Sequence, residues 1–510
     1  MAFGEIIREV ARKFPKSTSI VFQERRFTFQ DTNERVNRLA NALLQSGFTK
    51  GERAAILSLD CHEFLETVYA LSKIGAIVVP LNYMLNPKDL IYMCNNAGVK
   101  ATFVGRGYHD LVKSFKKELP DLQRYISFVS AEGMESYDAL LDSAGSQEPQ
   151  VKIEGQDNVA ICYTSGTTGL PKGVVLTHDY WSRGPGILGS ALGYRDHGVY
   201  YSGLPLFHAS GIIMTTSAIY NGNSVVLLER FEVEKSLEIM EKEHVTHTFF
   251  IPSMINFMLD SPSCKTRNLS NLRMVNYGGT PFPPDVLKRS FEVLKCNFIQ
   301  GYGMTEGGST FLNEQDHLMD GSAKKLKRLR SVGRPIADIT VKVVDDQDRE
   351  VPQGEIGELV FRGPTMLKEY WKMPEATAEA LRNGYFHTGD LGYMDDEGYF
   401  YVVDRKKDTI TTGGETVYPN DVEAIIYSHP AILEAAVIGI PDPEKGEKVI
   451  AVVALKKDKQ VSADEILDFC RGKLKENQVP QFVEFLNLLP RNASGKVLKT
   501  DLRKKYFSKI

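Results

Sequence analysis

The sequence lacks several features that would assign it to a particular class of protein. Its six cysteines are scattered and form no CxxC pair, which excludes a disulfide framework and favours a reducing compartment. No apolar run approaches the length that a bilayer requires. The first residues, MAFGEIIREVARKF, carry acidic side chains and no apolar core segment, so they predict an amphipathic helix and not a signal peptide.

An excess of charge of one sign is also missing. The 61 Lys and Arg residues nearly balance the 65 Asp and Glu residues, which gives a net charge of −4. No overall field therefore attracts nucleic acid, and a polyanionic ligand must be bound by a local site. The basic run KKLKRLR at 324–330 is predicted to be a solvated face, with weak contact to a membrane surface or to ligand phosphates as the alternative.

The 510 residues are enough for more than one domain. The helical pattern of 30–46 ends at Gly47, and β-rich runs at 54–59 and 76–81 have a helix between them. This alternation is typical of a parallel sheet covered by helices. The same pattern recurs in runs at 200–206, 224–229 and 246–251.

The later part of the chain has a different texture. Short strands and Asp/Gly turns predominate at about 331–404. After 404, helices near 421–428 and 463–476 alternate with strands near 435–440 and 449–455. The predicted fold is α/β, with an N-terminal domain, 1–404, of helix-covered sheets that ends in a small β-barrel-like subdomain. A small α+β C-terminal domain, 405–510, is predicted to follow.

A loop rich in glycine and hydroxyl groups, TSGTTGLPKG, lies between two β-branched runs. Glycines let successive backbone N–H groups point at one centre, while hydroxyls and a lysine add further donors, as a phosphate requires. The spacing is not that of a Walker loop, and a strand pattern follows where a Walker loop would start a helix. A phosphate cradle is one hypothesis and a flexible Gly/Thr tether is the other. The residues concerned are Thr164, Ser165, Gly166, Thr167, Thr168, Gly169 and Lys172.

Further motifs follow this loop in a fixed order. Together with TSGTTGLPKG they resemble those of the adenylate-forming superfamily, which contains acyl-CoA synthetases, aryl-CoA ligases, amino-acid adenylation domains and beetle luciferases. The agreement covers nearly the whole chain. The motifs are LPLFH (204–208), GGTP (278–281), QGYGMTE (300–306), YFHTGDLG (385–392), DRKKD (404–408) and PRNASGK (490–496).

QGYGMTE predicts part of a nucleotide site. An aromatic ring between glycines is open to close approach, which suits stacking of Tyr302 on adenine. The resemblance implies that Glu306 and Thr164 hold Mg²⁺, which prefers hard oxygen ligands, and that Thr305 bonds a phosphate or carboxylate oxygen. For Glu306 the alternative is a solvated loop carboxylate. The turn implied to line the adenine and acyl pockets consists of Gly278, Gly279, Thr280 and Pro281, and the further residues predicted to bind the nucleotide cofactor are Gly301, Gly303 and Met304.

Four residues nearer the C-terminus receive roles from the resemblance. Asp390 is implied to accept hydrogen bonds from the ribose, and Arg405 to reach ribose and phosphate. Lys407 matches the position about which family members pivot. Lys496 is implied to bridge the acyl carboxylate and the α-phosphate. The alternatives are a simple turn, a solvated linker over 404–408 and a surface lysine.

The motif LPLFH indicates the branch of the superfamily. Amino-acid adenylation domains usually have an aspartate where His208 stands, and an imidazole cannot replace it as the counter-ion of an ammonium group. A plain carboxylic acid is therefore favoured, although a satisfied core histidine is the alternative. Gly413 and Gly414 resemble the loop that lines the pantetheine tunnel of CoA. The pair His244 and His247 lacks a third ligand, which predicts a structural role and no metal.

The predicted function is an ATP- and Mg²⁺-dependent carboxylic acid–CoA ligase, acting on medium- or long-chain fatty acids through an acyl-AMP. The alternatives are an aryl- or cinnamate-type CoA ligase, an acyl-AMP ligase that loads a carrier protein, and a non-catalytic sensor on the same scaffold. Expected partners are a small acid, ATP and CoA, with a homodimer as a possible assembly and no nucleic acid. The last triplet, 508–510, is SKI, one residue from the peroxisomal signal SKL. A cytoplasmic location is nevertheless predicted.

Overall fold

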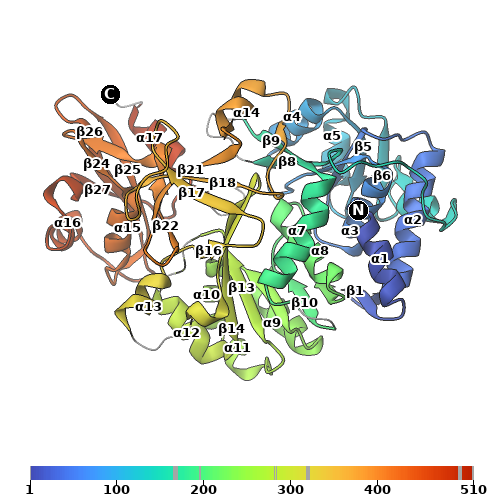
Figure 1. The fold of residues 1–510 in the computed structure, drawn as a ribbon, viewed down its shortest axis with the longest axis horizontal. Helices are drawn as coiled ribbons and strands as arrows, with labels where there is room; N and C mark the ends of the chain where they lie inside the picture. Colours follow the sequence, from blue (N-terminus) through green and yellow to red (C-terminus); the bar gives the residue numbers. More distant parts are fainter. Residues whose placement is uncertain are drawn as a thin grey trace. The chain divides into compact units, whose positions relative to one another are not determined.

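The computed structural model describes residues 2–164, 170–194, 197–280, 282, 284–317, 322–491 and 497–507. Contacts divide the chain into two compact units (Figure 1). Unit 1 comprises Met1–Val341 and Phe361–Phe386, and unit 2 comprises Lys342–Val360 and His387–Ile510. Contacts thus group residues 387–404 with the C-terminal residues, and the domain boundary after 404 stays a prediction.

Unit 1 contains a nine-stranded sheet in the order β16-β15-β14-β13-β12-β10-β11-β1-β2. The strands from β14 to β1 pair in parallel, whereas β2, β15 and β16 are antiparallel additions at the two edges. The bounds are β1 (Thr18–Phe22), β2 (Arg25–Thr28), β10 (Val199–Ser202), β11 (Ser224–Leu227), β12 (His247–Phe250), β13 (Met274–Gly278), β14 (Asn297–Met304), β15 (Gly307–Leu312) and β16 (Arg334–Pro335).

A second sheet of unit 1 has eight strands in the order β19-β9-β8-β4-β3-β5-β6-β7. Its centre is parallel, and β8, β9 and β19 form an antiparallel edge. The bounds are β3 (Arg53–Leu57), β4 (Ile77–Pro80), β5 (Val99–Val104), β6 (Arg124–Ser127), β7 (Glu135–Ser136), β8 (Asn158–Thr164), β9 (Lys172–Thr177) and β19 (Glu369–Tyr370).

Helices cover both sheets of unit 1. Helix α7 (His178–Ala191) packs on β8 and β9, α8 (Ala209–Tyr220) packs on β10 and β11, and the two helices pack on each other (Figure 1). Gly184 of α7 allows this close packing because it has no side chain. A Cβ at this position would lie only 3.2 Å from Cδ1 of Ile213 in α8. The others are α1 (Glu5–Lys13), α2 (Phe29–Gln45), α3 (His62–Lys73), α4 (Pro87–Ala97), α5 (His109–Ser114), α6 (Tyr137–Asp142), α9 (Val233–Lys242), α10 (Pro252–Asp260), α11 (Ser263–Thr266), α12 (Pro284–Leu294), α13 (Ala323–Arg328) and α14 (Pro374–Ala380), with 3₁₀ turns η1 (Lys116–Glu118) and η2 (Glu314–His317).

Five short strands, several of which cross the unit boundaries, form a sheet in the order β17-β18-β21-β20, with β22 beside β21. This order is open, so the described strands do not show the barrel-like closure that was predicted for the subdomain. The strands are β17 (Thr340–Val344), β18 (Gly357–Arg362), β20 (Leu381–Arg382), β21 (Tyr385–Met394) and β22 (Phe400–Arg405).

The rest of unit 2 is a five-stranded sheet, β24-β23-β26-β25 with β27 beside β26, and its helices. Helix α16 ends at Arg471, before the predicted residue 476, and Gly472 follows it at the C-cap position. The elements are η3 (Lys406–Asp408), β23 (Ile410–Thr412), β24 (Glu415–Val417), α15 (Pro419–Tyr427), β25 (Ile432–Asp442), β26 (Gly446–Leu455), α16 (Ala463–Arg471), η4 (Glu476–Gln478), β27 (Phe482–Phe485) and α17 (Lys499–Phe507).

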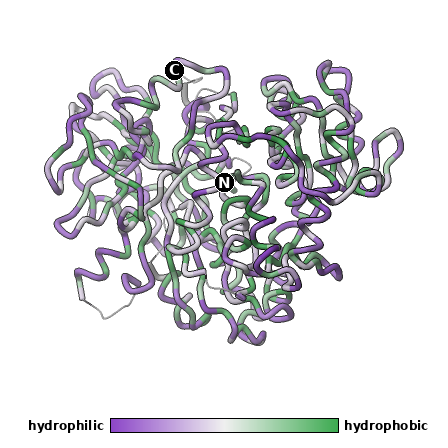
Figure 2. Tube along the Cα trace, turned by 45° about the vertical axis from the view of Figure 1, so that its right-hand side comes forward, coloured by the Kyte–Doolittle hydropathy of each residue, from purple (hydrophilic) through white to green (hydrophobic). Residues whose placement is uncertain are grey.

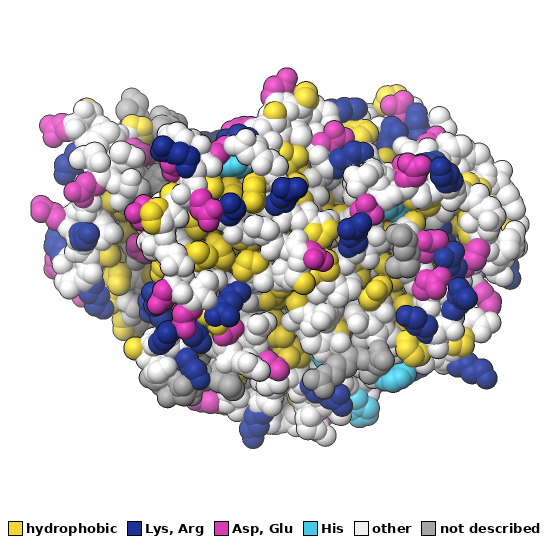
Figure 3. Space-filling view, in the orientation of Figure 1, with side chains coloured by type: hydrophobic (Ala, Val, Ile, Leu, Met, Phe, Trp, Pro, Cys, Tyr) yellow, Lys and Arg dark blue, Asp and Glu magenta, His cyan; other side chains and the backbone are white. Residues whose placement is uncertain are grey.

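These elements confirm the predicted α/β class with parallel, helix-covered sheets. Hydrophobic and hydrophilic stretches alternate along the trace, as sheets buried under helices require (Figure 2). Acidic and basic side chains are interspersed on the face shown in Figure 3. Among the helices that the structure describes, none is both long and apolar enough to cross a membrane.

Candidate active site

The predicted phosphate loop is held between the ends of two paired strands. Thr164, the last residue of β8, lies opposite Lys172, the first residue of β9, and both are half-buried. A strand therefore follows the loop, as predicted. The loop residues Ser165, Gly166, Thr167, Thr168 and Gly169 lie outside the described residues.

The motif QGYGMTE forms the hairpin of β14 and β15. Met304 pairs with Gly307, so that Thr305 and Glu306 make the turn between the strands. Gly307 has a φ of +128°, and a Cβ there would collide with the carbonyl of Thr365. Only glycine therefore lets the hairpin lie against residue 365.

Tyr370 connects this hairpin with the phosphate-loop hairpin. Its hydroxyl donates a hydrogen bond of 2.9 Å to Oε1 of Glu306. The ammonium of Lys172 lies 5.1 Å from the centroid of the Tyr370 ring, within the range of a cation–π contact. The backbone amide of Leu367 also donates to the carbonyl of Glu306, at 2.7 Å. The structure thus brings Lys172 and Glu306 to opposite parts of one tyrosine.

The electrostatics keep this tyrosine a donor. Burial, and then the negative charge of Glu306, raise the pKa of the Tyr370 phenol well above its usual range. Its hydroxyl therefore stays protonated at neutral pH and holds the Glu306 carboxylate in place. Tyr370 was missed by the sequence analysis because it lies far along the chain from both of its partners.

Strand pairing brings the motif GGTP beside QGYGMTE. Gly278 pairs with Gly301, and a Cβ on Gly278 would collide with the carbonyl of Gly301 and lie 3.3 Å from the ring of Phe249. Gly279 has a φ of +85°, and Thr280 is exposed. Pro281 lies outside the described residues.

His208 occupies the N-cap position of α8, without a capping hydrogen bond from its side chain, and is half-buried. Burial lowers the pKa of its imidazole to about 4, so the ring is neutral at pH 7. Its ring centroid lies 4.4 Å from that of Phe207. A neutral imidazole supplies no charge to an ammonium group, which is consistent with the prediction that a plain carboxylic acid is favoured over an amino acid.

A buried carboxyl group positions the same motif and was missed by the sequence analysis. Asp60, only 4% exposed, accepts a hydrogen bond of 2.8 Å from the amide of Leu206, two residues before His208. Burial raises the pKa of Asp60 well above its usual value. Asp60 follows β3 of the eight-stranded sheet, so it anchors LPLFH to that sheet.

In unit 2, Asp390 and Arg405 lie opposite each other on β21 and β22. Nε of Arg405 lies 2.7 Å from Oδ1 of Asp390, whose side chain is nearly buried. Lys407 is exposed within η3. A solvated linker, the alternative for 404–408, is wrong for Asp404, which is 2% exposed and accepts a 2.8 Å hydrogen bond from the amide of Asn420.

Gly413 and Gly414 form the two-residue turn between β23 and β24. Their φ angles are +60° and +82°, the conformation of a type I′ hairpin turn. Both glycines are exposed, and a Cβ on either would meet no atom within 4 Å. Lys496 lies outside the described residues.

The donor set near the phosphate loop fits Mg²⁺. Glu306 offers a carboxylate and Thr164 a hydroxyl, and this ion commonly takes one or two protein oxygens together with water and phosphate oxygens. Within the described ranges, no group of three or more His, Cys, Asp or Glu residues is placed to hold a metal. His247 contacts Thr246 and the carbonyl of Gly193 through its two ring nitrogens, as a structural histidine does.

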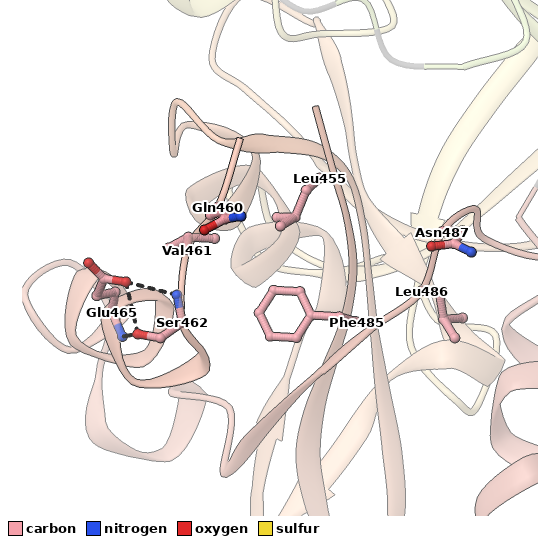
Figure 4. A pocket seen from close by; sticks show the side chains of 8 residues that line it. All are labelled: Leu455, Gln460, Val461, Ser462, Glu465, Phe485, Leu486 and Asn487. Atoms are coloured by element: carbon pink, nitrogen blue, oxygen red, sulfur yellow. Dashed lines mark hydrogen bonds between the residues drawn. The ribbon is translucent and has the colours of Figure 1, made fainter. Parts of the chain in front are cut away.

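A surface pocket of unit 2 contains none of the predicted site residues. It lies between the start of α16 and the end of β27 (Figure 4). The Ser462 and Glu465 side chains on its rim are engaged in the capping box of α16. Its lining also includes Leu455, Phe485, Leu486 and Asn487.

The chain matches the family model of the AMP-binding enzyme over residues 7–371 and that of the AMP-binding enzyme C-terminal domain over residues 421–496. It belongs to the AMP-binding enzyme family, and its predicted membership of the adenylate-forming superfamily is confirmed.

Several proteins are similar to this chain along nearly all of its length. A long-chain-fatty-acid–CoA ligase, FadD13 of Mycobacterium tuberculosis, is 33% identical and covers 99% of both chains. A feruloyl-CoA synthase of Amycolatopsis is 34% identical over 97% of both chains. A fatty acid–[acyl-carrier-protein] ligase, ScoC of Streptomyces coeruleorubidus, is 32% identical over 98% of this chain and 95% of its own. The structure of ATP-bound MatB from Rhodopseudomonas palustris aligns with a TM-score of 0.89 and 27% identity over 99% of both chains. The predicted class, an acid–thiol ligase, is confirmed.

Proposed function

We propose that the protein is an ATP- and Mg²⁺-dependent ligase that joins a carboxylic acid to CoA through an acyl-AMP. The observation that carries this proposal is the contact of Lys172 and Glu306 with one tyrosine beside the phosphate-loop hairpin. A cation and a carboxylate that contact the same tyrosine supply the groups that a metal-bound nucleoside triphosphate needs.

The proposed reaction has two steps. A carboxylate oxygen of the acid attacks the α-phosphorus of ATP, and the bond from this phosphorus to the bridging oxygen of pyrophosphate breaks. Lys172 and Lys496 are the cations proposed to stabilise the charge that develops. The CoA thiolate then attacks the acyl carbon, and AMP leaves with the electron pair of the broken C–O bond.

The remaining site residues are proposed to hold the nucleotide and to open the path for CoA. Tyr302 stacks on adenine, and Asp390, fixed by Arg405 at 2.7 Å, accepts hydrogen bonds from the ribose. Lys407 is the proposed pivot, and the Gly413–Gly414 turn is the proposed wall of the pantetheine path. The cytoplasmic location remains a prediction.

The acid is proposed to have a largely apolar body. His208 is neutral, and the buried aliphatic residues Ile212 and Ile213 follow it on α8. A medium- or long-chain fatty acid meets this description, as does an aryl-propenoic acid. The similarity to FadD13 supports the first, and the similarity to the feruloyl-CoA synthase supports the second.

Exchange of labelled pyrophosphate into ATP, measured with acids from acetate through palmitate to ferulate, tests the proposal. At least one acid should support exchange, and addition of CoA should yield its thioester. Lys496→Ala should abolish exchange yet largely spare thioester formation from supplied acyl-AMP. An absence of exchange with every acid, or equal loss of both half-reactions in the variant, would contradict the corresponding assignment.

A carrier-protein thiol is the alternative acceptor, which the similarity to ScoC favours. Competition between CoA and a phosphopantetheinylated carrier protein for preformed acyl-AMP decides between them. CoA should be acylated faster if the main proposal is right.

A further inference from the structure

One face of the nine-stranded sheet carries polar side chains deep within the core of unit 1. Gly278 and Asn276 point to the same face of β13, because they are two residues apart, a step of about 7 Å along a strand. Tyr200 on β10 faces the same core, whereas its neighbour Tyr201 belongs to the core on the opposite side of the sheet. Tyr194, which follows α7, lies against Tyr200 with ring centroids 5.5 Å apart.

Four polar atoms of this cluster are buried without a hydrogen-bond partner among the described residues. They are the hydroxyls of Tyr194 and Tyr200 and both amide atoms of Asn276. Tyr200 and Asn276 are fully buried and Tyr194 is 6% exposed. Burial raises the pKa of Tyr194 well above its usual value, and both Tyr200 and Asn276 lie near enough to alter it further. Tyr200 likewise lies near enough to Tyr194 and Ser202 for these side chains to affect its pKa, although none of these contacts meets the geometric criteria of a hydrogen bond.

Burying these polar atoms lowers the stability of the fold unless hydrogen-bonding partners are supplied. Each buried polar atom without a partner costs about 1–3 kcal/mol. The cluster begins one strand step from Gly278, which has no side chain and pairs with Gly301 at the predicted acyl pocket. An acid whose carboxyl group lies near the nucleotide and whose body runs along this face would reach Asn276 and the two tyrosines with its far end.

We propose that the acid carries a neutral hydrogen-bonding group, such as a hydroxyl or carbonyl, that is bound by Asn276, Tyr200 and Tyr194. This inference rests on the proposed function and names the substrate class of the same site. The amide of Asn276 both donates and accepts, as do the phenol hydroxyls, so they match a neutral group. None of the three residues is charged, and burying an unpaired carboxylate or ammonium group among them would be far more costly.

Matched pairs of acids test the proposal: octanoic with 8-hydroxyoctanoic acid, and cinnamic with 4-hydroxycinnamic acid. In at least one pair, the kcat/KM for acyl-AMP formation should be about tenfold higher for the hydroxylated acid, because it satisfies partners that the parent leaves unpaired. In Tyr200→Phe and Asn276→Leu this preference should fall to about threefold or less.

Tyr201→Phe is the matched control, because it removes a hydroxyl from the next residue of the strand on the opposite face. That hydroxyl has a partner, Ser236, at 2.8 Å. Tyr201→Phe should keep the substrate preference but lower the thermal unfolding temperature. Tyr200→Phe should lose the preference and leave the unfolding temperature unchanged or raised.

The outcomes separate this inference from the proposed function. Two results would overturn the inference alone. The first is an equal kcat/KM for both members of each pair of acids, and the second is a preference for the hydroxylated acid that survives in both Tyr200→Phe and Asn276→Leu. Equal thermal destabilisation by Tyr200→Phe and Tyr201→Phe would also overturn it, because buried water would then already satisfy Tyr200. Failure of every acid would overturn the proposed function and this inference with it.

Discussion

At the residue scale, the Tyr370 hydroxyl contacts the carboxylate that is proposed to bind Mg²⁺. Tyr370 contacts Glu306 through its hydroxyl, at 2.9 Å, and Lys172 through its ring, at 5.1 Å. The two contacts use different parts of the side chain, so substitutions can remove them separately. Tyr370 acts through Glu306 and is a positioning residue.

Tyr370→Phe should raise the Mg²⁺ concentration needed for half-maximal pyrophosphate exchange about three- to tenfold. The reason is that a hydrogen bond to a charged group contributes about 1.5 kcal/mol or more, and its loss removes one of the contacts that position the Glu306 carboxylate. Exchange rates over a Mg²⁺ titration at saturating ATP measure this shift. Calorimetric binding of Mg²⁺–ATP in the absence of acid should weaken by a similar factor.

Tyr370→Leu supplies the contrast, because it removes the ring as well as the hydroxyl. It should weaken Mg²⁺–ATP further, since Lys172 loses its cation–π partner, worth about 0.5–1 kcal/mol at an accessible site. Identical Mg²⁺ titrations for wild type and Tyr370→Phe would contradict the positioning role.

Local strings of sequence predicted most of the candidate site, but not the residues that hold it in place. The phosphate loop, QGYGMTE and GGTP could be recognised because each is a short motif. Tyr370 and Asp60 could not, because their partners lie 64 and 146 residues away. Such contacts depend on how distant segments of the chain pack together, which no local pattern encodes.

At the element scale, Gly413 in the β23–β24 turn has two properties that one substitution can separate. It has a positive φ angle, and it has no side chain that could obstruct the proposed path of CoA. Gly413 has a φ of +60°, which asparagine also adopts at small cost, and a Cβ there has open space. Gly413→Asn should therefore keep the hairpin and the stability of unit 2. If the pantetheine arm passes this turn, thioester formation from supplied acyl-AMP should fall about tenfold, equivalent to 1.4 kcal/mol, with exchange unchanged.

Gly398→Asn is the matched control for this prediction. Gly398 has a φ of +78°, and a Cβ there would also meet no atom within 4 Å. It lies between β21 and β22 and has no predicted role in catalysis. Both half-reactions should be unaffected in this variant. Equal rates of thioester formation in the Gly413 and Gly398 variants would remove the turn from the proposed CoA path.

Sequence patterns predict the end of one helix well and the end of another poorly. Helix α2 ends at Gln45, close to the predicted stop at Gly47, because an apolar stripe and a glycine mark it. Helix α16 ends before its predicted bound, since its pattern continues past the cap at Gly472. The predicted barrel-like closure depends on which strands pair, and the order of strands in a sheet is not a local property.

At the scale of the whole molecule, the N-terminus is tied to the helices between the two sheets of unit 1. The amide of Phe3 donates a 3.2 Å hydrogen bond to Nδ1 of His178, the first residue of α7. His178 is fully buried, and burial lowers the pKa of its imidazole to about 4. A proton on Nδ1 would face the Phe3 amide hydrogen, so folding requires this ring to be neutral.

Acid should therefore destabilise the folded chain partly through His178. The unfolded chain takes up a proton near the ordinary histidine pKa of about 6.5, whereas the folded chain does so only near pH 4. Between these values the unfolded state binds more protons, so the free energy of unfolding falls as the pH falls, by up to about 1.4 kcal/mol per pH unit for this group. His178→Gln should remove about one proton from the pH dependence of unfolding between pH 6.5 and 4. Denaturant unfolding over a pH series measures this, with the exposed His244→Asn as the control that should follow wild type. Parallel curves for wild type and His178→Gln would show that the buried ring is not linked to the stability of the N-terminal packing.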